Sequence, residues 1–224
     1  MRMQFIEPTF KRKYFVPPRE GDDLPDASWA YYSSNPIIRA VYYARLRQSL
    51  GMVENTQRNQ KILDIGTGSG VLIPSLARYG KVYAVDREEK FLAKARALCA
   101  RYSIPSIIRR ADILALPFRD SIFDTITCIS IMEHVQDLDK AFTEIRRVMK
   151  KGGALVVGVP IEKFLVKSIF SLFGLQQEKT GHCSHYTIIE QKLRNYFVAK
   201  KIKKIPSFLP HSLSLYKMYY CIKE

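Results

Sequence analysis

A glycine-rich segment directly follows a short apolar run early in the chain. Residues 62–80 read ILDIGTGSGVLIPSLARYG, with glycine at positions 66, 68 and 70. Glycine allows positive φ angles, and its missing side chain lets backbone N–H groups approach a ligand closely. The segment therefore predicts a strand, a ligand-holding turn and a helix. Because Val71 takes the place of the last glycine of a GxGxxG fingerprint, a dinucleotide is not the favoured ligand.

Three carboxylates lie at the ends of three successive predicted strands. Asp64 precedes the turn, Asp86 ends the second strand, and Asp112 ends the third. An acid at the end of the second strand can accept hydrogen bonds from both ribose hydroxyls, which favours an adenosine-like ligand. Three carboxylates would repel a triphosphate, and a GK[ST] sequence is missing, so a ligand with a positive centre fits better. S-adenosylmethionine has this character, with its adenosine, sulfonium and α-amino groups.

Alternating strand and helix patterns would position these acids. The expected strands are Lys61–Ile65, Lys81–Asp86, Ser106–Asp112, Phe123–Ile131 and Ala154–Pro160. The expected helices are Asn35–Leu50, Glu88–Tyr102 and a third between Asp137, the predicted N-cap, and Gly152. This alternation predicts a parallel sheet with helices on both faces.

The last part of the chain departs from that alternation. Thr187 and Glu190 fit a capping box for a short helix to Phe197. Two further strands, Lys200–Ile205 and Tyr216–Lys223, are too close in sequence for a crossover helix and should be antiparallel. We therefore expect an α/β, Rossmann-like, doubly wound seven-stranded sheet, mostly parallel, with an antiparallel C-terminal strand.

The chain length of 224 residues suits one domain with a large core. We expect an N-terminal helical or cap segment over 1–60, a ligand-binding core over 61–160, a substrate-side insert over 161–186, and a C-terminal helix and hairpin over 187–224. Inserts at the carboxyl ends of parallel strands usually build or cover the binding crevice.

Composition narrows the class of protein. With 47% hydrophobic and 25% charged residues, the chain is typical of a globular protein, and no apolar run approaches the roughly 20 residues of a membrane span. Without a signal-peptide pattern, the expected location is cytoplasmic, and peripheral membrane contact stays open. A net charge of +15 favours nucleic acid, anionic lipid or phosphorylated partners, or serves solubility alone. Four cysteines without a CxxC pair indicate neither disulfides nor a zinc ribbon.

Residues 62–160 resemble the core of the class I S-adenosylmethionine-dependent methyltransferases. The likeness is greatest to the small-molecule group that includes the ubiquinone and menaquinone biosynthesis methyltransferases. Five motifs match in order: LDIGTGSG at 63–70, VD at 85–86, ADILALPF at 111–118, FD at 123–124 with MEHV at 132–135, and EIRRVMKKGG at 144–153. The segment HCSHYT at 182–187 is similar to the residues that open a late helix in many members.

The resemblance implies which residues hold the cofactor, S-adenosylmethionine. Asp64 and the glycine turn would hold its methionine part, the acid at the end of the second strand its ribose, and the acid after the third its adenine. The full set is Asp64, Gly66, Thr67, Gly68, Ser69, Gly70, Asp86, Arg87, Asp112, Ile113, Ser130 and Ile131, the last two flanking the sulfonium. The alternative to a cofactor contact is a helix-capping or turn role for Asp64 and, for Asp112, that of a solvated acid in a loop.

Methyl transfer is an in-line displacement at carbon, so alignment and water exclusion lower most of its barrier. A general base matters only when the nucleophile must lose a proton. The candidates are His134, His182, His185 and Tyr186. The alternative for His134 is a structural or cofactor-side role, and for the other two histidines that of an ordinary loop residue. Because Cys183 and these histidines lack a fourth ligand at a recognisable spacing, no metal is expected.

Missing motifs argue against nucleic-acid substrates. Residues 129–132 read ISIM, where relatives that methylate the exocyclic amines of bases or glutamine amides carry Asn or Asp followed by Pro-Pro and an aromatic residue. The Pro-Cys pair of cytosine-C5 enzymes is also missing, because Thr127 precedes Cys128.

Two apolar segments with basic residues bear on the acceptor. Residues 162–175, EKFLVKSIFSLFGL, suit a membrane interface, a pocket wall or a cap helix. Asn35–Leu50, with Arg39, Arg45 and Arg47, is a second basic amphipathic candidate. The leading hypothesis is a methyltransferase acting on a small hydrophobic or membrane-derived acceptor. The alternatives are an RNA methyltransferase, motivated by the charge and the lysines of 200–204, and a non-catalytic S-adenosylmethionine-binding subunit.

Overall fold

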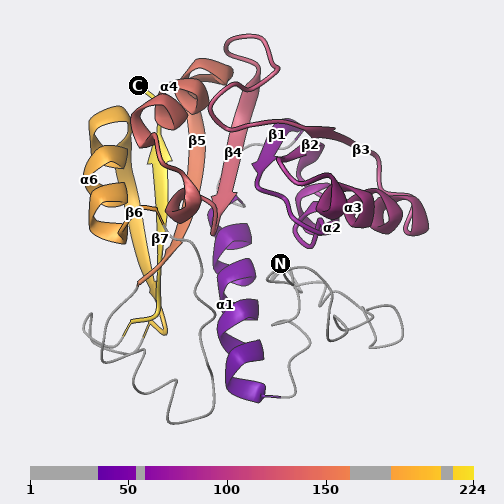
Figure 1. Ribbon diagram of the computed structural model, residues 1–224, viewed down its shortest axis with the longest axis horizontal. Coiled ribbons are helices and arrows are strands. Elements are labelled where there is room, and N and C mark those ends of the chain that lie inside the picture. Colours follow the sequence, from indigo (N-terminus) through magenta and orange to yellow (C-terminus); the bar gives the residue numbers. More distant parts are fainter. Residues whose placement is uncertain (1–34, 54–58, 162–182, 208–213) are drawn as a thin grey trace.

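The computed structural model describes residues 35–53, 59–161, 183–207 and 214–224, which contain one seven-stranded sheet (Figure 1). The strand order is β3-β2-β1-β4-β5-β7-β6, with β1 to β5 parallel, β7 antiparallel to β5, and β6 antiparallel to β7. The strands are β1 Gln60–Ile65, β2 Gly80–Asp86, β3 Ser106–Arg110, β4 Phe123–Ile129, β5 Met149–Pro160, β6 Val198–Ile205 and β7 Tyr216–Ile222. The predicted fold class is confirmed.

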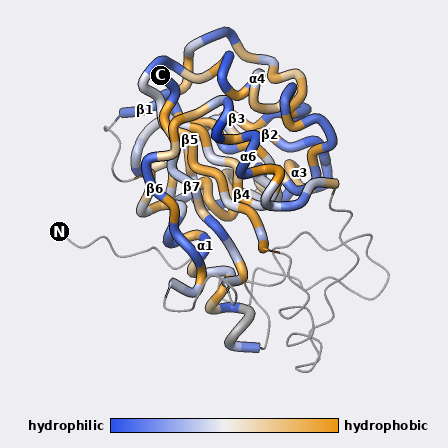
Figure 2. The backbone as a smooth tube through the Cα atoms, turned by 90° about the vertical axis from the view of Figure 1, so that its left-hand side faces the viewer, coloured by the Kyte–Doolittle hydropathy of each residue, from blue (hydrophilic) through white to orange (hydrophobic). Residues whose placement is uncertain are grey.

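Helices cover both faces of the sheet. They are α1 Pro36–Val53, α2 Ile73–Leu76, α3 Glu89–Arg101, the 3-10 helix η3 Met132–His134, α4 Leu138–Val148 and α6 Tyr186–Tyr196. Side chains alternate along the strands, so Ile62 joins the core under α1, α2 and α3, and Leu63 joins the core under α4 and α6. Figure 2 shows apolar residues concentrated in the central strands β4 and β5. In Figure 1, α1 extends past the carboxyl end of β4.

Several element boundaries differ from those expected. β3 ends at Arg110, so Asp112 lies in the following loop, and β4 ends at Ile129 because Ser130 has a φ of 56°, outside the range of a strand. Asp137 caps α4 as predicted, and its Oδ1 accepts a hydrogen bond from the Lys140 N–H at 2.9 Å. α4 ends at Val148 rather than near Gly152, which lies within β5.

The predicted capping box of the last helix is wrong. His185 is the N-cap of α6, and its Nδ1 accepts from the Thr187 N–H at 3.5 Å. Glu190 accepts instead from Lys217 Nζ at 2.6 Å and from Tyr219 Oη at 2.8 Å, both on β7, and from Arg194 on its own helix. Since Lys217 is only 8% exposed, this contact holds a nearly buried ammonium against a carboxylate. It joins α6 to β7.

Glu190→Gln should lower the melting temperature at pH 7 and have little effect near pH 2. Burial raises the pKa of Glu190, but hydrogen bonds from Lys217, Arg194 and Tyr219 outweigh it and lower the pKa from 4.5 to about 2. A depressed carboxyl pKa stabilises the fold above the unfolded-state value, and this stabilisation disappears as pH falls from 4.5 to 2. Calorimetric melting from pH 7 to 2 measures it, with the exposed Glu89→Gln as control. An equal deficit at both ends of the range would contradict this ionic role.

Among the described segments, no helix is both long and apolar enough to cross a membrane. The cytoplasmic location and the domain subdivision stay predictions, and residues 162–175 lie outside the described residues.

Candidate functional site

The glycine turn between β1 and α2 uses the backbone freedom of its glycines. Gly66, Gly68 and Gly70 have φ angles of 70°, 54° and 80°. A Cβ at Gly66 would lie 2.8 Å from Cδ1 of Ile131, so this position also needs glycine for packing. A Cβ at Gly68 would meet no atom within 4 Å. The middle of the turn therefore borders open space, where a ligand can approach the backbone.

Backbone hydrogen bonds join the turn to the end of β2. The N–H groups of Gly66 and Thr67 donate to the Val85 carbonyl at 2.8 and 3.0 Å, and the Gly68 N–H donates to Asp86 Oδ2 at 2.9 Å. The other oxygen, Asp86 Oδ1, accepts from the Glu88 N–H at 2.9 Å. The carboxylate is thus fixed at the strand end by two backbone donors. Each of its oxygens keeps a further lone pair with which it can accept a hydrogen bond.

Asp64 is buried beside the same turn, at 3% exposure. Burial raises its pKa to about 6, and the nearby Asp86 charge adds to this, while a 2.6 Å hydrogen bond from Thr127 Oγ1 opposes it. The nearby Thr67 hydroxyl also lowers the pKa of Asp64, although this buried hydroxyl forms no hydrogen bond of good geometry. A buried carboxylate of this kind gains stability from a positive ligand group, which is the chemistry expected of an α-ammonium or a sulfonium.

Asp112 is exposed in the loop after β3, where its Oδ1 accepts from the Leu114 N–H at 2.9 Å. The Arg147 guanidinium of α4 donates to two backbone carbonyl oxygens of this loop, those of Phe118 and Leu116, at 2.7 and 2.9 Å. Glu144 in turn accepts from Arg147 and from the Leu116 N–H. A side chain of the EIRRV motif therefore holds the loop that carries Asp112 at Leu116 and Phe118.

Arg147→Lys should lower the free energy of unfolding by about 1–2 kcal/mol, because lysine keeps the charge but cannot serve both carbonyls and Glu144. We also expect weaker binding of S-adenosylhomocysteine, by a few-fold, if the loop carries the adenine contact. Urea unfolding and calorimetric titration measure the two effects. Arg119→Lys, on an exposed residue of the same loop, is the matched control. An Arg147 variant as stable as the control would refute the clamp.

Ser130 and Ile131 lie side by side at the carboxyl end of β4. The Ile131 side chain covers Gly66, while Ser130 turns toward α1 and β7. Its Oγ accepts from Arg45 Nη1 at 2.9 Å and lies 2.7 Å from Tyr216 Oη. Arg45 is 7% exposed, so it does not belong to the polar face that a basic amphipathic helix would present to solvent. The sequence did not predict the contacts of Arg45 and Tyr216 with Ser130, because the three residues are far apart along the chain.

The candidate catalytic residues come partly together. The N–H groups of Cys183 and Ser184 donate to the Glu133 carbonyl at 2.7 and 3.1 Å, which brings the start of α6 beside the MEHV segment. His134 and His185 are exposed, and the His185 ring lies 4.5 Å from that of the half-buried Tyr186, centroid to centroid. His182 lies outside the described residues. The catalytic roles of all four stay predictions.

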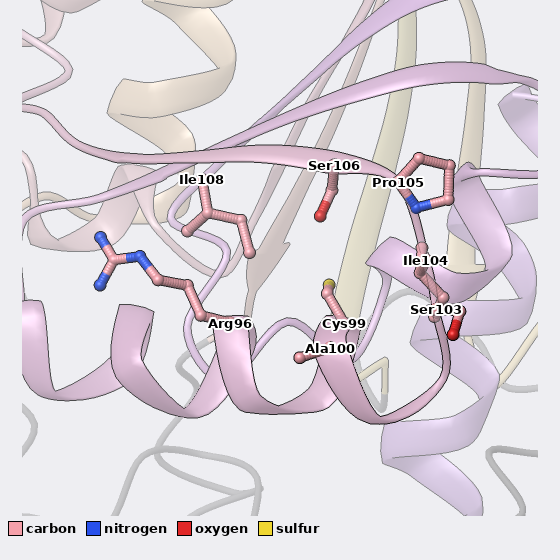
Figure 3. A pocket seen from close by; sticks show the side chains of 8 residues that line it. All are labelled: Arg96, Cys99, Ala100, Ser103, Ile104, Pro105, Ser106 and Ile108. Atoms are coloured by element: carbon pink, nitrogen blue, oxygen red, sulfur yellow. The ribbon is translucent and has the colours of Figure 1, made fainter.

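Two cavities lie away from the acids. Figure 3 shows a pocket between α3 and β3. The residues that line it include Cys99 of α3 and Ser106 and Ile108 of β3. Because it opens at the amino end of β3, it lies at the opposite end of that strand from Asp112. In the part of the chain that the structure describes, no three His, Cys, Asp or Glu side chains gather to hold a metal.

Comparison with known proteins identifies the domain. Residues 63–157 match the family described as the methyltransferase domain. The chain carries a class I S-adenosylmethionine-dependent methyltransferase domain. The ubiquinone/menaquinone biosynthesis C-methyltransferase of Cupriavidus metallidurans is 29% identical to this chain over 151 residues, 62% of each chain. The family and the cofactor expected from the sequence are thereby confirmed.

The fold of the methyltransferase domain also recurs in solved structures. An S-adenosylmethionine-dependent methyltransferase from Aquifex aeolicus has a TM-score of 0.66 at 16% identity, covering 90% of this chain and 100% of that one. The [4+2]-cyclase SpnF has a TM-score of 0.63 at 17% identity, covering 80% and 81%. At such identities the likeness shows the fold alone. The chain spans 47% to 62% of the length of the first curated relatives that it matches.

Proposed function

We propose that the protein transfers the methyl group of S-adenosylmethionine to a small, hydrophobic acceptor at the carboxyl ends of β4 and β5. The observation that carries this proposal is the buried Asp64, with its pKa of about 6, beside an open glycine turn. The acceptor class is supported by the relative from Cupriavidus metallidurans, which is named for ubiquinone and menaquinone biosynthesis. A quinone precursor, a prenylated compound and a lipid are all acceptors of this kind.

The residues present fit the cofactor. Asp64 would face its ammonium and sulfonium groups, and the backbone around Gly68 borders the open space for its methionine part. Asp86, fixed by two backbone N–H groups with Arg87 beside it, would accept hydrogen bonds from the ribose. Asp112 and the Ile113 backbone would contact the adenine, and Ser130 and Ile131 would flank the sulfonium. When bound, the cofactor supplies an electrophilic methyl group, and the protein supplies alignment and water exclusion.

Thermal shift with S-adenosylhomocysteine tests the cofactor site directly. We expect the product nucleoside to raise the melting temperature, because a ligand that binds only the folded state stabilises it, and NAD to have no effect. A shift with NAD alone would overturn the proposal in favour of a dehydrogenase.

Activity needs a separate test, since the [4+2]-cyclase SpnF shares the fold. Incubation with S-[methyl-³H]adenosylmethionine and a cell extract should label an organic-soluble fraction in a protein-dependent way. Cofactor binding without label in any fraction would instead support the non-catalytic subunit.

The positive charge offers a second acceptor class, RNA. Of the lysines of β6, an edge strand, Lys200 and Lys201 are exposed, and so is Ile202. RNA gel shift and flotation with anionic liposomes, both at physiological salt, separate RNA from a membrane surface, because nonspecific RNA binding weakens steeply with salt. Salt-resistant RNA binding without flotation would favour the RNA methyltransferase.

A further inference from the structure

A buried arginine faces the carboxyl end of the sheet. Arg45 of α1 is 7% exposed, and its Nη1 donates to Ser130 Oγ at 2.9 Å. Its Cζ lies 3.9 Å from the ring centroid of Tyr42 and 5.0 Å from that of Tyr216. Two aromatic rings and a hydroxyl thus fix the guanidinium, which stays charged at every ordinary pH.

In the strand order, this guanidinium lies on the other side of β1 from Asp86 and Asp112. Asp64, Asp86 and Asp112 belong to β1, β2 and the loop after β3. Arg45 contacts the end of β4 and, through Tyr216, the start of β7, which are on the far side of β1 in the strand order. In Figure 1, α1 lies beyond the end of β4, in line with these contacts.

The backbone of β5 makes room for this group of side chains. A Cβ at Gly158 would lie 2.7 Å from Tyr216 Oη, so only glycine lets the tyrosine hydroxyl lie there, 2.7 Å from Ser130 Oγ. Ser130 adopts a φ of 56° and donates its N–H to the Gly158 carbonyl at 2.9 Å. A positive φ at a residue other than glycine costs free energy and commonly marks a functional position.

The charge of Arg45 determines which kind of ligand these side chains would bind. A fixed guanidinium and the cofactor's sulfonium repel each other at short range, and an anion between them is attracted by both. We propose that Arg45, Ser130 and Tyr216 form a subsite for an anionic oxygen of the methyl acceptor, a carboxylate or an ionised phenol on an apolar body. The subsite rests on the proposed function. The positive charge would also favour the ionised form of a bound phenol.

The cofactor has a carboxylate of its own, which is the second anionic oxygen group that suits these side chains. The contacts of Arg45 at the end of β4 and the start of β7, on the other side of β1 from Asp86, favour the acceptor. The two sources are separable by experiment, because only one of them is part of S-adenosylhomocysteine.

The test uses a matched pair of probes, 4-hexylbenzoate and 4-hexylbenzamide, titrated calorimetrically into the full chain saturated with S-adenosylhomocysteine. We expect the wild type to bind the benzoate at least tenfold more tightly than the amide. Arg45→Met should remove this preference, Arg45→Lys should keep part of it, and Tyr216→Phe should reduce it a few-fold. Arg47→Met, on an exposed arginine of the same helix, should leave it unchanged.

The outcomes separate the two proposals. If the wild type does not bind S-adenosylhomocysteine, the proposed function fails and the subsite with it. If it binds the nucleoside but binds both probes equally, the subsite alone is refuted, whether or not the Arg45 variants fold. A loss of affinity in Arg45→Lys for S-adenosylhomocysteine, but not for its decarboxylated analogue, assigns Arg45 to the cofactor carboxylate and overturns the acceptor subsite.

Discussion

Asp86→Ala should weaken S-adenosylhomocysteine binding by about 1–3 kcal/mol, or roughly 5- to 150-fold, because a carboxylate that accepts from ribose hydroxyls is lost. The same change removes the acceptor of the Gly68 N–H and so releases the middle of the glycine turn. Isothermal titration calorimetry measures the affinity. Asp86→Asn, which keeps the shape and one acceptor oxygen, should show a smaller loss.

Two controls isolate the ribose contact of Asp86. Glu89→Ala makes the same charge change three residues away on an exposed side chain and should leave the affinity unchanged. An analogue without the 2′-hydroxyl should bind the wild type more weakly and lose less on Asp86→Ala. Unchanged affinity for S-adenosylhomocysteine in Asp86→Ala would refute the assignment of the ribose to β2.

Affinity for S-adenosylhomocysteine should rise about tenfold between pH 5 and pH 7 and then level off, because Asp64 must ionise to face the ligand ammonium. Its pKa is about 6, so about a tenth of the protein has the carboxylate charged at pH 5 and most of it at pH 7. Calorimetric titrations across this range measure the dependence. Asp64→Asn should bind more weakly at pH 7 and show no such rise.

Ionised Asp64 should lower the free energy of unfolding, whereas ionised Glu190 should raise it. A raised carboxyl pKa favours the folded state while the group is protonated, so its cost is absent below pH 3.8 and complete above about pH 6. Without ligand, Asp64→Asn should therefore be more stable than the wild type at pH 7, by up to about 3 kcal/mol. An Asn variant that keeps the wild-type pH dependence of binding would show that another group titrates.

Local sequence signals determined the order of the strands along this chain and the residues of the candidate cofactor site. Apolar β-branched runs and helical spacing predicted seven strands in their correct order along the chain, because burial on one or both faces imposes a short-range periodicity. Asp137 was identified as an N-cap because a cap acts within one helical turn. The glycines and acids of the candidate cofactor site were likewise visible, since they cluster at strand ends within about 50 residues.

Only the tertiary structure decided the contacts that join distant segments. Arg45 and Ser130 are 85 positions apart, and Glu190 finds Lys217 on β7 rather than its own helix end. From the sequence, the segment around Arg45 reads as a basic helix, and Thr187 with Glu190 reads as a capping box. Both interpretations rest on local propensity, which does not say which face of a helix will be buried. Packing of α1 against β4 and β7 turned a residue typical of surfaces into a buried charge. That burial, together with the permanent charge of the guanidinium, makes Arg45 a candidate for the acceptor site.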